Sequence, residues 1–139
     1  MNYLHLQRPE LRPFSALQGI TLSKITGLEK DSDTVLFYPR GLDTPRWQMT
    51  HHQDCCENVF IEDVIGDVAD LLHTPILEAY EESREATDDT RREGYDVEET
   101  WTFYRLRTIN GTVTIRWFGS SNGYYATNVT FEELLSVTK

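Results

Sequence analysis

The stretch WTFYRLRTINGTVTIRWFG, residues 101–119, decides the fold, because apolar and polar side chains alternate on both sides of Asn110-Gly111. An Asn-Gly pair between alternating runs indicates a β-hairpin whose type I′ turn needs positive φ at both central residues. With this pair as the loop, Ile109 opposes Thr112 and Arg105 opposes Arg116. The stretch holds three arginines and no acid, although the chain has a formal net charge of −10.

The alternation divides the predicted hairpin into two faces, since neighbouring side chains of a strand point to opposite sides. The apolar face is expected to pack on helices and consists of Tyr104, Leu106, Thr108, Val113, Ile115 and Trp117. The other face combines two aromatic rings with three guanidinium groups and consists of Phe103, Arg105, Arg107, Thr114, Arg116 and Phe118.

Directly opposed arginines destabilise a strand pair, so Arg105 and Arg116 need a compensating partner. In one interpretation the acidic segment 78–99 or a neighbouring subunit supplies carboxylates, and the face is an ion-pair network. In the other, a phosphorylated ligand binds, because guanidinium forks match phosphate oxygens and Phe103 and Phe118 can stack on a base. The adjoining SSNGYY, residues 120–125, is either a plain turn or places Asn122 to read a ribose or base edge.

The rest of the chain predicts short antiparallel strands and a few helices. Strands are expected over 20–29, 34–39, 46–51, 58–65 and 123–129, separated by turn-forming clusters. Asp67 can cap a short helix over 68–73, Thr74-Pro75 can start a helix through 76–86, and Thr130 can open a last helix over 131–137. We therefore expect a single α+β domain, an antiparallel β-sheet or meander with two or three short-to-medium helices.

Length and composition bound the organisation of the chain. Its 139 residues suit one domain, with residues 1–17 as an N-terminal arm and residues 86–99 as an acidic, flexible loop. No apolar run is long enough for a membrane span, and net acidity repels nucleic acid and anionic membranes. Cys55 and Cys56 are adjacent, a poor arrangement for a structural disulfide, which favours a reducing, cytoplasmic compartment.

The segment HHQDCCE, residues 51–57, gathers the densest set of candidate metal ligands and nucleophiles. Adjacent histidines and cysteines lack the spacing of zinc sites, and nothing in the sequence lowers a cysteine pKa for catalysis. Besides metal binding and cysteine catalysis, a structural role is possible for this segment, with small buried thiols and a histidine that ties a strand end to a turn. Phosphate-binding glycine motifs and nucleophile elbows do not occur, so we expect no enzyme, no cofactor and no metal.

The acidic run TDDTRREGYDVEE, residues 87–99, allows a different function. Charge runs are commonly solvated surfaces, but this one could also bind a protein or mimic DNA in a basic site. The alternative function is therefore an acidic, protein-binding inhibitor of a host protein.

The blocks HHQDCCENVFIEDVIGDVADLLHTPILEA (51–79) and WTFYRLRTINGTVTIRWFGSSNGYY (101–125) resemble a family of small bacteriophage proteins described as a domain of unknown function. Within it they are similar to the first-described class of Thoeris anti-defence proteins. The resemblance implies a non-enzymatic sponge, a homo-oligomer that binds a cyclic ADP-ribose isomer, and in some members cyclic oligonucleotides, near subunit interfaces. It implies aromatic, arginine and asparagine contacts without aligning them one by one.

The hairpin and the resemblance lead to one hypothesis, because an ADP-ribose isomer carries phosphates and an adenine. We expect a phage protein that sequesters a cyclic nucleotide immune signal in the host cytoplasm without cleaving it. Phe103 and Phe118 would stack on the base, Arg105, Arg107 and Arg116 would neutralise phosphates beside Thr114, and Asn122 would read ribose or base.

Overall fold

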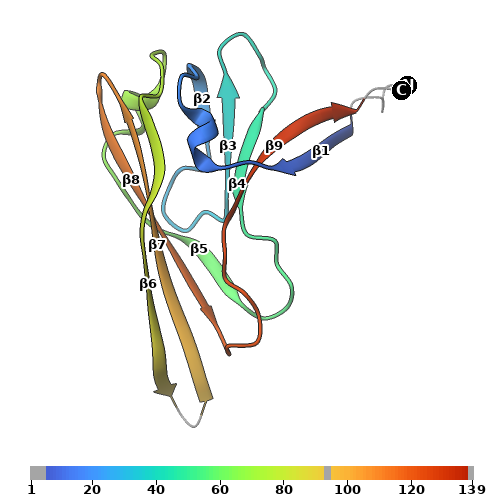
Figure 1. Cartoon of the computed structure of the whole chain (residues 1–139), viewed down its shortest axis with the longest axis vertical. Helices are drawn as coiled ribbons and strands as arrows, with labels where there is room; N and C mark the ends of the chain where they lie inside the picture. The colour runs from blue at the N-terminus through green and yellow to red at the C-terminus, as the bar shows by residue number, and fades with distance from the viewer. Residues whose placement is uncertain (1–5, 93–94, 138–139) are drawn as a thin grey trace.

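The chain folds into two antiparallel β-sheets that pack against each other, as seen in a computed structural model that describes residues 6–92 and 95–137 (Figure 1). The five-stranded sheet has the order β1-β9-β4-β3-β2 and the four-stranded sheet the order β5-β8-β7-β6. The strands are β1 (Leu6–Leu11), β2 (Leu22–Thr26), β3 (Thr34–Pro39), β4 (Trp47–Thr50), β5 (Asn58–Ile65), β6 (Glu78–Arg92), β7 (Tyr95–Thr108), β8 (Gly111–Ser121) and β9 (Thr130–Val137). Two single 3₁₀ turns, η1 (Phe14–Leu17) and η2 (Val68–Leu71), complete the fold.

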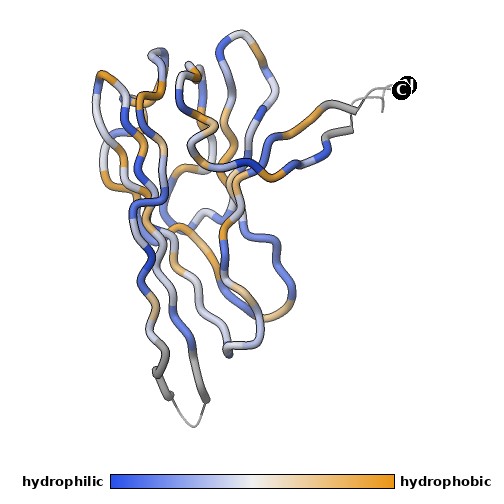
Figure 2. Tube along the Cα trace, viewed as in Figure 1, coloured by the Kyte–Doolittle hydropathy of each residue, from blue (hydrophilic) through white to orange (hydrophobic). Residues whose placement is uncertain are grey.

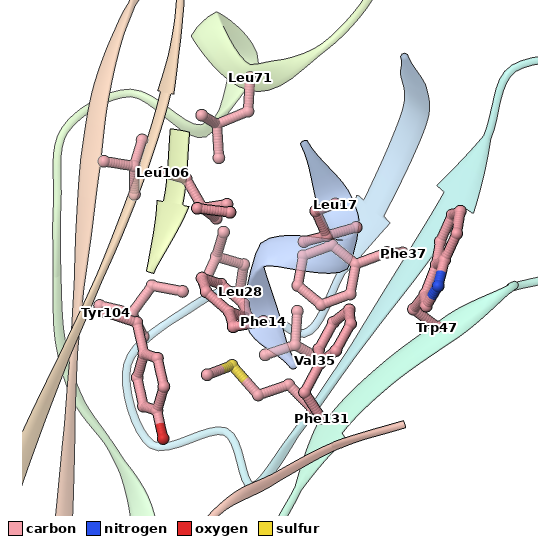
Figure 3. Close-up of a cluster of buried hydrophobic side chains, with 14 of the residues drawn as sticks. Phe14, Leu17, Leu28, Val35, Phe37, Trp47, Leu71, Tyr104, Leu106 and Phe131 are labelled. Carbon is pink, nitrogen blue, oxygen red and sulfur yellow. The ribbon is translucent and has the colours of Figure 1, made fainter. Parts of the chain in front are cut away.

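The core lies between the sheets because alternate residues of the central strands point inward. Phe14 of η1 sits at its centre, with ring centroids 5.2 Å from Tyr104 of β7 and 5.3 Å from Phe131 of β9 (Figure 3). Each ring meets its neighbour edge to face, the arrangement favoured by aromatic quadrupoles. One aromatic cluster thus joins both sheets and the segment between β1 and β2.

The predicted α+β class is wrong, because the described residues contain no α-helix. The segment expected as a helix over 76–86 instead enters β6, where Ala79 pairs with Leu106 and both side chains are fully buried. Its Glu, Ala and Leu residues favour a helix in isolation, but pairing along the whole of β7 overrides that local preference. The expected helix start at Thr74-Pro75 is also wrong, because Pro75 forms a β-bridge with Thr21.

The last predicted helix, 131–137, is strand β9 between β1 and β4. Thr130 and Glu133 match a capping box in sequence, but Glu133 instead forms ion pairs with Arg12 at 3.0 Å and Arg46 at 2.6 Å. These two arginines hold the pKa of Glu133 below its usual value, Arg46 contributing most. In this segment, strand pairing and the ion pairs of Glu133 therefore outweigh the local preference for a helix.

Most of the predicted short strands are present in the structure. Those over 34–39 and 58–65 coincide with β3 and β5, and those over 20–29 and 46–51 contain the shorter β2 and β4. Asp67 caps as expected, accepting the Ala69 N–H at 3.0 Å, but the helix is only the turn η2. Residues 123–129 form no strand.

The ends and the acidic segment take up strand structure. In the predicted arm, β1 pairs with β9 and η1 delivers Phe14 and Leu17 to the core, while residues 1–5 lie outside the described residues. In the segment predicted as a loop, residues 86–92 and 95–99 belong to β6 and β7, and residues 93–94 lie outside the description. This hairpin extends past the body (Figure 1), and residues 81–85 of β6, which lead into the extension, are hydrophilic (Figure 2).

The β7–β8 hairpin is present, but its register differs from the prediction by two residues. Thr108 pairs with Gly111, so the loop is Ile109-Asn110, and neither residue has positive φ. The type I′ turn is therefore wrong. Because a shift of two residues leaves every side chain on its original face, both predicted faces are preserved.

Candidate functional site

The face of the four-stranded sheet that points away from the core carries the predicted ligand-binding residues of the hairpin. We call it the outer face, and β7 and β8 contribute to it Trp101, Phe103, Arg105, Arg107, Thr112, Thr114, Arg116 and Phe118. The observed register places Arg116 opposite Phe103 and Arg105 opposite Thr114. The expected opposition of two arginines is thus absent.

Each arginine of the outer face contacts a carboxylate. Arg105 lies 3.0 Å from Glu82, Arg107 donates from Nε to Glu78 at 2.7 Å, and Arg116 Nε lies 2.8 Å from Glu62. Two of these partners come from the acidic segment of β6, as the ion-pair interpretation expected. The arginine side chains remain 33–43 % exposed, and such pairs contribute only about 0–1 kcal/mol. The outer face is therefore an ion-pair network whose members can exchange partners at small cost.

A shallow hollow of about 310 Å³ opens on the outer face beside the Phe103–Arg116 pair. Its lining residues are Glu62, Glu85, Trp101, Phe103 and Arg116. The Trp101 indole N–H points to Glu62 at 3.4 Å. Arg116 Nε is shielded from solvent and, despite its nearness to Glu62, makes no well-aligned hydrogen bond. The hollow thus combines two rings, one guanidinium and two carboxylates.

The structure brings some of the predicted residues together and separates others. Phe103 and Arg116 line the hollow, and Arg105 and Thr114 pair beside it. Phe118 packs against Trp101 with centroids 5.5 Å apart and the rings tilted by 58°. Arg107 lies at the hairpin end, whereas Asn122 follows the other end of β8 and accepts the Tyr124 N–H at 3.0 Å. Arg107 pairs with Thr112, ten positions before Asn122, so about 33 Å of strand separates them, too far for one small ligand on one subunit.

Sequence reasoning missed three members of the hollow. Trp101 continues the outward alternation of Phe103 and Arg105, and this signal could have found it. Glu62 lies on the correctly predicted strand 58–65, but its partner strand was not predicted. Glu85 was assigned to a helix, so nothing placed it opposite Trp101, its observed partner in β7.

A second hollow, of about 390 Å³, opens between the sheets. Its apolar wall includes Phe14, Met49, Tyr104 and Phe131, and its rim includes Glu81. Burial, followed by the charge of Glu81 and the hydrogen bond to it, raises the pKa of Tyr104, so its hydroxyl stays protonated and donates to that carboxylate.

The 51–57 loop is organised around a fully shielded Glu57 side chain. Glu57 accepts the backbone N–H groups of Asp54 at 2.8 Å and Cys55 at 2.9 Å and lies 2.7 Å from His51 Nε2. These contacts, the Asp54 N–H foremost, lower its pKa to about 2. The other nitrogen of His51 lies 2.6 Å from the Asn128 carbonyl oxygen, which confirms that the histidine ties a strand end to a turn.

The cysteines differ from the prediction. Cys55 and Cys56 are exposed and joined by a disulfide, not buried as thiols. Across the described ranges, no three His, Cys, Asp or Glu side chains gather as a metal site. This loop therefore serves the fold through Glu57 and His51.

Comparison with known proteins gives one match. The profile of a family described as a domain of unknown function (DUF7448) matches residues 20–131, most of the chain. No curated protein and no solved structure matches. Within the described residues, none of the helical segments has the length and apolarity needed to cross a bilayer.

Proposed function

We propose that this chain, which belongs to the DUF7448 family, binds a cyclic nucleotide signal and holds it without cleaving it. The resemblance to Thoeris anti-defence proteins suggests a cyclic ADP-ribose isomer as the ligand and the cytoplasm of a phage-infected bacterium as the place. The observation that carries the proposal is the pairing of Phe103 with Arg116 at the edge of a hollow that also holds Trp101.

The chemistry of the outer face supports binding of such a ligand. Aromatic faces stack on nucleobases, and arginine forks match phosphate oxygens. Arg105 and Arg116 are partly exposed and held by weak surface ion pairs, so a ligand group, such as a phosphate at Arg105, can replace a carboxylate partner. Retention without cleavage is what the resemblance implies. The two carboxylates of the hollow, Glu62 and Glu85, can transfer protons, so the experiment below also looks for a cleaved product.

Retention of the ligand further suggests a homo-oligomer. At about 310 Å³, the hollow is near the lower limit of small-molecule sites, which span about 300–1,000 Å³ and bury most of their ligand. A second subunit over the outer face would enclose the ligand and slow its release. The proposal therefore includes ligand binding near a subunit interface.

The decisive experiment is native mass spectrometry of the protein after incubation with cyclic ADP-ribose isomers and cyclic di- and trinucleotides. We expect a retained ligand that is recovered intact after denaturation, and loss of retention in Phe103→Ala and Arg116→Ala. Arg46→Ala is the matched control, because Arg46 is also exposed and ion-paired but lies directly before β4 of the other sheet. Recovery of a cleaved product would make the protein an enzyme, and retention of no ligand would refute the proposal.

A second candidate function is an acidic inhibitor that binds a host protein. It is favoured by the extension of β6 and β7 past the body (Figure 1) and by the exposed acidic side chains of these two strands, among them Glu82, Glu85 and Glu98. Such an inhibitor should be indifferent to Arg116→Ala and should lose its partner when these three acids become glutamine. The same arginine variant thus separates the two functions.

A further inference from the structure

The hollow on the outer face has the wrong charge balance for a phosphate but the right one for the edge of a base. Its lining holds the carboxylates of Glu62 and Glu85 against the single guanidinium of Arg116. A phosphate placed among them would meet more negative than positive charge. The aromatic walls, Trp101 and Phe103, instead suit a flat ring.

Strand pairing places these groups in two adjacent rows across the sheet. One row runs Glu85, Trp101, Phe118, and the next runs Ser83, Phe103, Arg116. A base lying over Trp101 and Phe103 therefore has Glu85 on its β6 side. Arg105, two positions along β7 from Phe103, remains available for phosphates outside the hollow.

The two carboxylates are not equivalent. Glu62 already faces Arg116 Nε at 2.8 Å and accepts from the Trp101 indole at 3.4 Å. The Glu85 side chain is exposed and forms no hydrogen bond or ion pair with any described residue. Its acceptor sites are therefore the ones open to a ligand.

An ionised carboxylate can only accept hydrogen bonds. It pairs with the amino group of a base, but opposite a base carbonyl it meets another acceptor and gains nothing. We propose that Glu85 reads an amino group on the bound base and makes the hollow selective for amino-bearing bases such as adenine over hypoxanthine. This inference rests on the proposed nucleotide-binding function and assigns the specificity of that site.

The test compares ligands that differ only in this group. The probes are cyclic ADP-ribose isomers joined ribose to ribose, in which the adenine amino group is free, and their deaminated hypoxanthine analogues. Binding is measured by titration calorimetry for the wild type, Glu85→Gln and Glu81→Gln. Glu81 is the control because it lies on the same strand but lines the other hollow, beside Tyr104.

The wild type should bind the adenine form at least about tenfold more tightly, the usual effect of a hydrogen bond to a charged group. Glu85→Gln should bring the two affinities within about threefold, because an amide can also donate to the hypoxanthine oxygen. Glu81→Gln should keep the wild-type preference.

The outcomes distinguish this inference from the function on which it rests. Equal binding of both ligand forms by the wild type, or an unchanged preference in Glu85→Gln, overturns the base-reading role and leaves sequestration standing. Binding of neither form overturns both.

Discussion

The two faces of the β7–β8 hairpin share one backbone and one register, yet they do different work. The inner face is closed: Leu106, Val113 and Ile115 are fully buried between the sheets. The outer face is open, with half-exposed arginines beside aromatic rings around a hollow. A strand pair can thus fix the fold with one set of alternate residues and leave the other set free for binding.

The largest expected effect lies on the inner face. Leu106→Ala removes a fully buried side chain that packs between Ala79 and Val113, its neighbours in β6 and β8. The free energy of unfolding should fall by about 2–5 kcal/mol, measured by urea denaturation. Arg107→Ala, one position along on the outer face, should cost about 1 kcal/mol or less. Equal losses would remove the distinction between the faces.

The next effect concerns the one carboxylate that the 51–57 loop shields completely. The pKa of Glu57 is lowered to about 2 in the fold from an ordinary value of 4.5. A lowered pKa means that its stabilisation is complete above about pH 4.5 and is lost as the pH falls towards 2. Glu57→Gln should therefore destabilise the protein at pH 7 and flatten its acid-induced loss of stability.

Denaturant titrations between pH 7 and 2.5 measure this dependence. Glu78→Gln serves as the control, since Glu78 is half-exposed on the outer face and should leave the acid profile near that of the wild type. An unchanged profile in Glu57→Gln would show that other carboxylates cause the acid sensitivity.

The comparison also explains what the sequence could reveal. The division of the hairpin into two faces follows from the alternation of side chains alone. A register shift of two residues does not change this division, so Phe103, Arg105 and Arg116 were correctly placed on one face. The carboxylates that contact these residues could not be predicted, because they lie on strands distant in the sequence. Glu82 and Glu85 occupy a segment with strong helix propensity, and only pairing with β7 makes it a strand.

The same limit applies to the class of fold. Strands flanked by turn signals, such as 34–39 and 58–65, could be found locally. In β9, Glu132 is buried and acceptable there because Gln48 donates to it at 2.9 Å and His52 Nε2 lies 2.9 Å from it. No local pattern indicates partners that are eighty or more positions away. The predicted helices were wrong in the segments whose secondary structure is decided by long-range strand pairing.

A smaller effect tests whether the rings of the outer face are structural or available. Phe118 touches Trp101 and Phe60 at centroid distances of 5.5 and 5.4 Å. Phe118→Ala should lower the free energy of unfolding by about 0.5–1.5 kcal/mol through the lost ring contacts, in addition to the loss of buried apolar area. It should also weaken ligand retention, because Trp101 loses a neighbour that holds it in place. Phe118→Leu should restore most stability but not retention, as measured by denaturation and native mass spectrometry.

The smallest effect is the most informative for the outer face, because it asks whether Arg116 is committed to the fold. A double-mutant cycle of Arg116→Ala and Glu62→Gln measures their coupling in the free protein, which should be about 0.2–1 kcal/mol, as for exposed pairs. A coupling in that range leaves the guanidinium free to exchange Glu62 for an acceptor atom of the ligand. A coupling above about 2 kcal/mol would mean that Arg116 is held as firmly as a core contact, and the outer face would then be part of the scaffold as much as the inner one.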